Sequence, residues 1–386
     1  MSGPLRIALV AGEPSGDEIG ARLMASLRRL APGGVGFLGV GGPRMAGEGL
    51  ASLFPYEELS VMGLVEVLPR ALRLRRRLAE TSAAIRAARP HALVTIDSPG
   101  FAVRLAERLT GADFPFIHYV APTVWAWRPE RARTFARLFD RLLTLLPFEP
   151  ELFAVHGLAS EHVGHPVLES GAGSGDGAAF RARHGLGEAA CAVCFLPGSR
   201  AQEVRRLLPV FAATAERVRA RHPDLVALLP SLHPVAAEVR RAVTRWPVRT
   251  IVVEGEAEKR DAMAAAHAAL AASGTVSLEL ALARLPQVIA YRLHPLTAWT
   301  VRRLIKVPHV SLVNLLAEEA AIPEFLQDDC RPDRLAAALE RLLASPEERA
   351  AQRQAGELAL SRLRAEAGEA PSMLAARAVL RTAEAV

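Results

Sequence analysis

A turn of small and polar residues, AGEPSGDEIG at 11–20, is the first part of the sequence that could do chemistry. It follows the apolar run LRIALV, and a helical pattern begins within it. Its glycines, Gly16 among them, would let another molecule approach the backbone closely. Ser15 or Asp17 would cap the helix, whose free N–H groups favour an anion or sugar oxygens. Capping does not account for Glu13, so a ligand contact and a purely structural turn both stay open for this residue.

A second carboxylate, Asp97, stands directly after the apolar run ALVTI, where a buried strand is expected to end. The reactive groups of doubly wound sheets lie at the carboxyl ends of their strands. A carboxylate in that place could accept a proton as a general base. A helix or turn cap is the alternative interpretation of the same residue.

An aromatic loop, HYVAPTVWAWRPERAR, contains the end of another expected strand. Trp125 and Trp127 stand two residues apart between Pro122 and Pro129, and arginines follow them. The two indoles could form a binding platform, and packing in the core is an equally good interpretation of them.

Two later turns have the residues of a nucleotide site. In FLPGSRAQEV, Gly198 and Ser199 would open a helix beside Arg200, an arrangement suited to a diphosphate. In ASGTVSLELALA, Thr275 precedes a helix whose Glu279 could hold ribose hydroxyls. Plain capped helices are the alternative for both turns. The sequence has no Asp-x-Asp and no metal-ligand residues at suitable spacing, so we expect no metal and no cofactor, and positive charge from Arg200 and helix dipoles.

Alternating strand and helix patterns surround these turns, which favours an α/β fold of doubly wound parallel sheets. A chain of 386 residues is too long for one ordinary core, so we expect two domains. The stretch 169–179 is rich in Gly, Ser and Ala, and is the expected linker between an N-terminal domain, 1–168, and a C-terminal domain, 180–362. The helical pattern of 363–386 predicts a final helix that packs back on the N-terminal domain.

Composition limits the partners and the compartment. A net charge of +6 and a pI near 9.8 suggest a partner that carries phosphate or an anionic surface. Three cysteines are too few for a disulfide framework, and together with the lack of an export signal they predict a cytoplasmic protein. The weakly charged run AMAAAHAALAASGTVSLELALA is long enough for a membrane span, but its polar residues favour a helix, a turn and a helix in a globular domain.

Ten short stretches, read in order, resemble those of the lipid-A-disaccharide synthase family, whose members are inverting glycosyltransferases of the GT-B architecture. Along essentially the whole chain they are AGEPSGD, GVGGPRM, VMGLVEVLP, IDSPGF, HYVAPTVWAWR, LPFE, VGHP, LPGSR, ASGTVSLE and SLVNLLAE. The resemblance implies two Rossmann-like doubly wound domains that face a cleft, with the UDP-sugar held mainly by the C-terminal one. It also implies that UDP-2,3-diacylglucosamine donates its sugar to the 6-hydroxyl of 2,3-diacylglucosamine 1-phosphate, which yields UDP and the β-1,6-linked lipid A disaccharide 1-phosphate.

The resemblance further implies roles for single residues. Inversion requires one in-line displacement, in which a base removes the acceptor proton while UDP leaves from the opposite face. Asp97 is the expected base and Glu13 is the competing candidate. Ser15, Gly16 and Asp17 would shape the acceptor side, and the UDP portion would be held by Gly198, Ser199, Arg200, Thr275, Glu279 and Asn314. Glu318 departs from the family pattern, because a glycine usually stands at its position, and this alters the expected shape of the loop.

Both substrates carry acyl chains, so the resemblance implies a peripheral protein at the cytoplasmic face of the inner membrane. The segment VMGLVEVLPRALRLRRRL joins an apolar stretch to five arginines and would insert into an anionic bilayer surface. Its apolar residues are Val61, Met62, Leu64, Val65, Val67 and Leu68. An amphipathic helix packed on the domain is the alternative. A second basic stretch, 299–306, could meet the acceptor phosphate or lipid headgroups; no nucleic-acid partner is expected, and a homodimer is left open.

Two other functions compete with this interpretation. One is another UDP-sugar enzyme of the same architecture, such as the peptidoglycan N-acetylglucosaminyltransferase or a UDP-GlcNAc 2-epimerase. The paired AGEPSGD and HYVAPTVWAWR stretches argue against both of these enzymes. The other is a non-catalytic relative that binds a nucleotide sugar or a lipid. Such a relative would be expected to lack Asp97 or Arg200, and both residues are present.

Overall fold

The structure of the protein is a computed structural model, and the chain in it divides into two compact units. The first comprises Met1–Pro166 and Leu363–Val386, and the second comprises Val167–Arg362. The described residues are 4–59, 64–231, 233–292, 308–365 and 368–384, and the side chains within 64–71 and 233–234 are not described.

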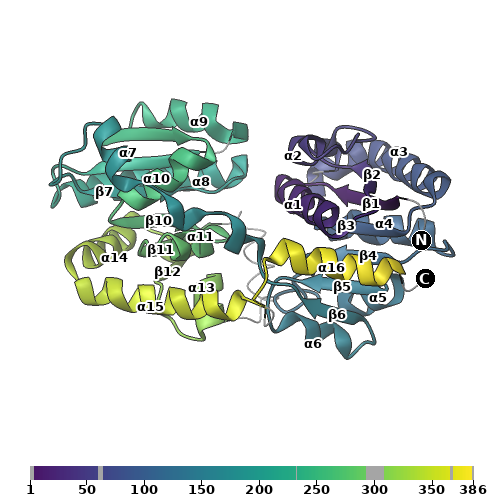
Figure 1. Ribbon diagram of the computed structural model, residues 1–386. Helices are drawn as coiled ribbons and strands as arrows, with labels where there is room; N and C mark the ends of the chain where they lie inside the picture. The colour runs from purple at the N-terminus through teal and green to yellow at the C-terminus, as the bar shows by residue number, and fades with distance from the viewer. Residues whose placement is uncertain (1–3, 60–63, 232, 293–307, 366–367, 385–386) are drawn as a thin grey trace. The chain divides into compact units, whose positions relative to one another are not determined.

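The first unit is built on a six-stranded parallel sheet with the strand order β2-β1-β3-β4-β5-β6 (Figure 1). Because the chain leaves β1 toward β2 and then crosses to β3 on the other side, the sheet has a switch point between β1 and β3. Ligands of doubly wound sheets bind at such points, outside the carboxyl ends of the strands. The strands are β1 (Leu5–Ala11), β2 (Val35–Val40), β3 (Ala92–Ile96), β4 (Phe116–Tyr119), β5 (Arg141–Thr144) and β6 (Ala159–His162).

Helices cover both faces of this sheet, which is why its central strands are apolar on both sides. In β1, Ile7 and Leu9 belong to the core under α1 and α16, whereas Ala8 and Val10 belong to the core under α3, α4 and α5. The helices of the unit are α1 (Pro14–Leu30), α2 (Pro43–Gly47), α3 (Leu64–Ala88), α4 (Pro99–Leu109), α5 (Arg131–Leu138), α6 (Glu149–Ala154) and α16 (Pro371–Glu384).

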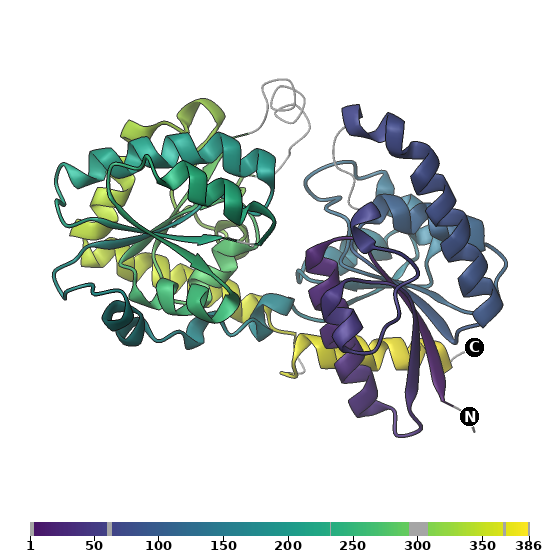
Figure 2. The same ribbon diagram turned by 90° about the horizontal axis from the view of Figure 1, so that it is seen from above.

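The C-terminal helix α16 is part of the first unit, although it follows the whole second unit in the sequence. Figures 1 and 2 show it in yellow, lying beside α1. Ala375, Ala376 and Val379 are fully buried against this face of the sheet. Ser26 Oγ and Ser372 Oγ are 3.0 Å apart, which adds a buried polar link between the two helices.

The second unit repeats the plan with the strand order β12-β11-β10-β7-β8-β9, again parallel throughout. Its switch point lies between β7 and β10. The strands are β7 (Ala192–Leu196), β8 (Val226–Ser231), β9 (Arg249–Glu254), β10 (Ala268–Ala272), β11 (Gln287–Tyr291) and β12 (Glu324–Leu326). The helices are α7 (Gly177–Arg183), α8 (Ala201–Arg219), α9 (His233–Val243), α10 (Glu256–Ala265), α11 (Val276–Leu282), α13 (Leu312–Ala317), α14 (Pro332–Ala344) and α15 (Pro346–Leu363).

The segment 169–179, which we expected to be a free linker, is instead folded onto the second unit. Asp176 N donates a 2.8 Å hydrogen bond to Asp261 Oδ1, and Asp176 Oδ1 caps α7 by accepting from Ala179 N. A Cβ on Gly175 would lie 2.1 Å from the carbonyl oxygen of Arg260, so the glycine is needed for close packing on α10. The small residues of this segment allow tight contact with α10. A flexible linker would have a similar composition, so the sequence alone does not distinguish the two.

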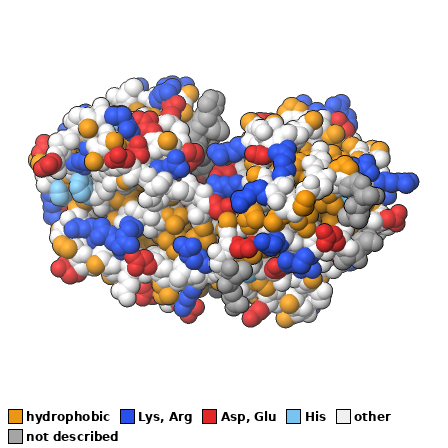
Figure 3. Space-filling view, in the orientation of Figure 1, with side chains coloured by type: hydrophobic (Ala, Val, Ile, Leu, Met, Phe, Trp, Pro, Cys, Tyr) orange, Lys and Arg blue, Asp and Glu red, His pale blue; other side chains and the backbone are white. Residues whose placement is uncertain are grey.

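The expected fold class, an α/β protein of two Rossmann-like doubly wound sheets, is confirmed. Along the described ranges, every helix falls short of the length or apolarity that a membrane crossing needs. On the face drawn in Figure 3, basic and acidic side chains are interspersed.

Candidate active site

The switch point of the first sheet brings two of the expected site residues into contact. Ala11 and Ile96, the last residues of β1 and β3, are register partners, so the turns that follow them start side by side. Ser15 Oγ donates a 3.2 Å hydrogen bond to Asp97 Oδ2. Ser15 is exposed and Asp97 is half-buried, so both side chains can be reached from solvent.

Asp97 is held in an uncommon backbone conformation. Its φ is +53° and that of Ser98 is +47°, a left-handed region that residues other than glycine rarely adopt. Asp97 N donates to Tyr119 O at 2.9 Å, and Asp97 Oδ1 accepts a 2.8 Å hydrogen bond from Ser98 N. Two consecutive strained residues at a strand end are a mark of functional sites. The cap that we considered for Asp97 therefore uses one carboxylate oxygen and leaves the other facing Ser15.

We had expected Ser15 or Asp17 to cap α1, but Asp17 does not do so. The helix has Glu13 at its N-cap, with extended backbone and no side-chain capping bond. Asp17 is 3% exposed, and its carboxylate accepts three backbone hydrogen bonds of 2.8–3.0 Å from the start of α2, donated by Gly42, Arg44 and Met45. Asp17 thus fixes the GVGGPRM turn instead of facing a substrate.

The glycines of the first turn also serve contacts within the chain. A Cβ on Gly12 would lie 2.8 Å from Ser98 Oγ, and one on Gly16 would lie 3.4 Å from the carbonyl oxygen of Ile96. These residues let the β1 and β3 turns come together, where we had expected them to admit another molecule. Glu13 lies half-buried in the same turn as Ser15.

The two tryptophans of the aromatic loop have different surroundings. Trp125 Nε1 donates a 3.2 Å hydrogen bond to Glu149 Oε1, and Glu149 Oε2 accepts from the backbone nitrogens of Leu145 and Leu146. Burial raises the pKa of Glu149 to about 7, against the opposing effect of these donors. Trp125 is thus an anchor of the loop, whereas Trp127 is 40% exposed. We had not singled out Glu149, although it ends the quoted LPFE stretch at the start of α6.

In the second unit, Gly198, Ser199 and Arg200 follow β7 at the switch point. Gly198 has a φ of +107°, and a Cβ on it would lie 2.7 Å from Glu203 Oε2, so only glycine fits this turn. Ser199 is exposed, and Arg200 stands at the N-cap of α8 with its side chain 54% exposed. Arg200 Nη1 lies 3.7 Å from Glu203 Oε1. A helix N-terminus beside a guanidinium can hold a diphosphate.

Glu279 and Thr275 follow β10, the other strand of the same switch point. Thr275 is exposed at the N-cap of α11, and Glu279 lies one turn into the helix. The Glu279 carboxylate forms a 2.5 Å ion pair with Lys259 Nζ of α10, and the two side chains are only 21% and 16% exposed. Sequence reasoning missed Lys259. The available signal was the rarity of lysine, because only two of the 47 lysines and arginines of the chain are lysines.

Asn314 has a different place from the direct UDP contact that we expected. It is completely buried in α13, and its Nδ2 donates to Ile322 O and Glu324 Oε1 while its Oδ1 accepts from Ile322 N, each at 2.8 Å. Asn314 therefore braces the chain around Glu324. Glu318, where the family usually has glycine, ends the same helix in the left-handed conformation with φ +61°.

The expected membrane segment is only partly described. Val61 and Met62 lie outside the described residues. Leu64, Val65, Val67 and Leu68 lie at the start of α3, and their side chains are not described. Further along α3, Arg77 pairs with Glu58 and Glu80 at 2.8 and 2.7 Å, which fits a helix packed on the domain, although that alternative placed the arginines in solvent. The second basic stretch, 299–306, lies outside the described residues.

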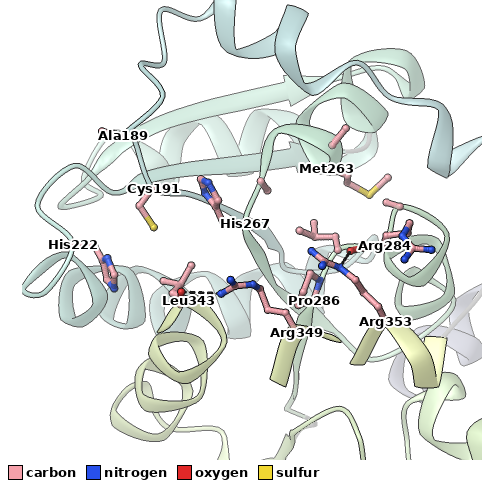
Figure 4. A pocket seen from close by; sticks show the side chains of 14 residues that line it. Ala189, Cys191, His222, Met263, His267, Arg284, Pro286, Leu343, Arg349 and Arg353 are labelled. Atoms are coloured by element: carbon pink, nitrogen blue, oxygen red, sulfur yellow. Dashed lines mark hydrogen bonds between the residues drawn. The ribbon is translucent and has the colours of Figure 1, made fainter. Parts of the chain in front are cut away.

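A cavity in the described part of the second unit is remote from these turns. It has a volume of about 600 Å³ and lies in the second unit, where Cys191, His267 and Pro286 precede β7, β10 and β11 (Figure 4). This is the amino-terminal edge of the sheet, opposite to the switch-point turns. None of the expected site residues lines it.

Comparisons with known proteins show the family of the chain. Residues 7–378 match the family model described as lipid-A-disaccharide synthetase. The chain is 53% identical over 379 residues to the lipid-A-disaccharide synthase of Rhodospirillum centenum. The matched region covers 98% of this chain and 94% of that protein. The lipid-A-disaccharide synthase of Paramagnetospirillum magneticum is 52% identical over 378 residues, covering 97% and 96% of the two chains.

Solved structures with low sequence identity share the fold. MurG of Acinetobacter baumannii has a TM-score of 0.58 at 13% identity, over 98% of this chain and 99% of that one. HepE of Anabaena, solved in complex with UDP and glucose, has a TM-score of 0.57 at 13% identity, over 99% and 100%. The fold that this chain shares with these structures is the GT-B fold. Because the family model and the relatives span nearly the whole sequence, the chain belongs to the lipid-A-disaccharide synthase family.

Proposed function

We propose that this protein transfers the sugar of UDP-2,3-diacylglucosamine to the 6-hydroxyl of 2,3-diacylglucosamine 1-phosphate. A bond forms between the acceptor O6 and the donor C1 while the bond from C1 to the diphosphate oxygen breaks. UDP leaves with the electron pair, and the product has a β-1,6 linkage. The observation that carries the proposal is the Ser15–Asp97 pair at the switch point of the first unit, in a chain of this family.

The proposed base is Asp97, which would take the proton of the acceptor hydroxyl. Its Oδ1 is occupied by Ser98 N, so the carboxylate has a defined orientation, and Oδ2 is the oxygen next to Ser15. Ser15 would orient the carboxylate. The acceptor hydroxyl would then replace Ser15 as the hydrogen-bond donor to Oδ2. Glu13, two residues before Ser15, is the competing base. A positioned general base contributes roughly 10²–10⁴-fold to a rate.

The donor would be held by the two turns at the switch point of the second unit. Ser199, Arg200 and the N-terminus of α8 would bind the diphosphate and stabilise its charge as UDP leaves. Glu279, fixed by Lys259, would accept hydrogen bonds from the ribose hydroxyls, with Thr275 near it. Asn314 would contribute by bracing the chain and not by touching UDP.

The protein would work at the cytoplasmic face of the inner membrane, because both substrates carry acyl chains. Leu72 of α3 is 79% exposed, and Arg73, Arg75 and Arg76 around it are exposed as well. An exposed leucine among unburied arginines, directly after the apolar segment 61–68, supports reversible binding to an anionic surface.

Incubation with both acylated substrates, with and without a chelator, tests the function. We expect UDP and a β-1,6 disaccharide 1-phosphate in equal amounts, unaffected by the chelator. If UDP and the disaccharide do not form, the proposed reaction is wrong. Transfer that stops in the chelator and returns with a divalent ion would overturn the charge assignment to Arg200 and the helix N-terminus.

A further inference from the structure

A small pocket in the first unit has no role in the scheme above. It has a volume of about 300 Å³ and lies after β4, between the aromatic loop and the start of α5. Its lining residues are Pro122, Thr123, Trp127, Arg128 and Arg131. They include two guanidinium groups and no carboxylate. β4 is the neighbour of β3 in the sheet, and Tyr119 at its end accepts the hydrogen bond from Asp97 N, so the pocket opens from the turn next to the proposed base.

The two arginines are available to a ligand. Neither Arg128 nor Arg131 forms a salt bridge with a carboxylate of the described residues. The guanidinium carbon of Arg128 lies 4.9 Å from the centroid of the Trp127 ring. Stacking uses the face of the guanidinium and leaves the N–H donors at its edge, where they can bind the oxygens of a phosphate in pairs.

One side-chain hydrogen bond and two left-handed residues define the conformation of the loop that forms this pocket. The Trp125–Glu149 hydrogen bond fixes it from inside, and Trp127, two residues later, is turned toward solvent. Val120 has a φ of +80° and Arg128 a φ of +54°, so two residues with Cβ atoms keep a left-handed conformation at the two ends of the loop. Strain of this kind persists where the surrounding contacts impose it, and it is concentrated at ligand sites.

We infer that this pocket binds the phosphate group of the acceptor, with Arg128 and Arg131 on the phosphate oxygens and the Trp127 indole against the apolar face of the sugar. The inference rests on the proposed function, in which the acceptor is a phosphorylated acyl sugar whose hydroxyl meets Asp97. A phosphate at one end of the sugar and a base at the other would orient the 6-hydroxyl. The pocket would thereby select a phosphorylated acceptor over a neutral one.

The test compares two acceptors in the variants Arg128→Gln and Arg131→Gln. One acceptor is 2,3-diacylglucosamine 1-phosphate, and the other has a methyl group on O1 in place of the phosphate. Loss of one charge-assisted contact is expected to raise the KM for the phosphorylated acceptor by about 10- to 100-fold. The KM for the methyl glycoside should not change. Arg133→Gln, an exposed residue of α5 outside the pocket, is the matched control and should resemble the parent protein.

Two results would overturn the inference. An equal loss toward both acceptors in the two variants means a structural role for the arginines. Unchanged kinetics with the phosphorylated acceptor means that the phosphate binds elsewhere. If the parent protein makes no disaccharide at all, the proposed function fails, and calorimetric binding of 2,3-diacylglucosamine 1-phosphate decides the inference separately. Binding that both variants weaken supports the pocket, and binding that is absent or unchanged by them refutes it.

Discussion

Ser15 and Asp97 are 82 residues apart in the sequence, yet Ser15 Oγ donates a 3.2 Å hydrogen bond to Asp97 Oδ2. The contact exists because β1 and β3 are neighbours in the sheet and because Gly12 and Gly16 let their turns approach. Ser98 N holds the other carboxylate oxygen, so Asp97 has one oriented oxygen beside a hydroxyl. In the proposed mechanism, the acceptor hydroxyl would replace Ser15 as the donor to this oxygen.

Replacing Asp97 with asparagine should reduce kcat by about 100- to 10,000-fold, because the amide cannot accept the acceptor proton. UDP binding, measured by calorimetry, should be nearly unchanged, since the proposed donor residues lie in the other unit. Near-normal turnover of this variant would remove Asp97 as the base and favour Glu13, for which Glu13→Gln is the companion measurement.

Replacing Ser15 with alanine should slow the reaction less, by about tenfold, because only an orienting hydrogen bond to a charged group is lost. If Ser15 acts through Asp97, Ser15→Ala should cost little further activity in an Asp97→Asn background. A full tenfold loss in that background as well would show that Ser15 acts on the substrate and not through Asp97.

Replacing Lys259 with methionine should weaken UDP binding, because Glu279 loses the cation that holds its carboxylate. The pair is largely buried, so we expect a loss of about tenfold or more in affinity. Glu256→Gln is the matched control, since Glu256 lies 3.7 Å from the same lysine but is 50% exposed, and it should bind UDP normally. Equal effects of the two variants would contradict a special role for the Lys259–Glu279 pair.

Replacing Glu318 with glycine should stabilise the second unit by about 0.5–1 kcal/mol, because glycine adopts the left-handed conformation without strain. The variant loses the ion pair to Arg362, but Glu318 is 76% exposed in that pair, so the cost is small. Glu318→Ala loses the same ion pair and keeps a Cβ, so urea unfolding should show no gain for it. A gain in unfolding free energy in both variants would mean that loss of the Glu318–Arg362 ion pair, and not release of backbone strain, causes the stabilisation.

Acid should destabilise the first unit through His118. This side chain packs against Phe135 and Phe139, with Nδ1 2.7 Å from Thr95 Oγ1, and burial lowers its pKa to about 3. A lowered histidine pKa gives stability that is fully present above the unfolded value of 6.5 and is lost as the pH falls below it. The slope is about 1.4 kcal/mol per pH unit for one such residue.

The measurement is urea unfolding between pH 7 and 5 for the parent, for His118→Gln and for the exposed control His156→Gln. The slope should be smaller in His118→Gln and unchanged in the control. Part of the slope should persist in His118→Gln, because burial also lowers the pKa of His165, to about 4. Identical slopes in all three proteins would contradict the buried, neutral state of His118.

The sequence by itself determined most of the strands, the turns after them and the family. It did not determine β10, because we expected the alanine-rich run that contains Ala268–Ala272 to form a helix, a turn and a helix, whereas these residues are a buried strand of the second sheet. Apolar runs such as LRIALVA and ALVTI stop where polar residues begin, because parallel strands are buried on both faces and their carboxyl ends are not. Such local patterns were sufficient to place Asp97, Glu13 and Arg200 at strand ends. They were also sufficient for the α/β fold class, because strand-like and helix-like stretches alternate along the chain.

Only the tertiary structure decided which polar groups are free for chemistry. Asp17, Asn314 and the glycines of the first turn look like ligand contacts in the sequence, but in the structure they contact other parts of the chain. The Trp125–Glu149 and Lys259–Glu279 pairs join different elements, and nothing local to either residue specifies the partner. Strand order selects these partners, and it results from long-range packing and not from periodicity. For that reason local sequence patterns predict which side chains lie at strand ends, but not which groups those side chains contact.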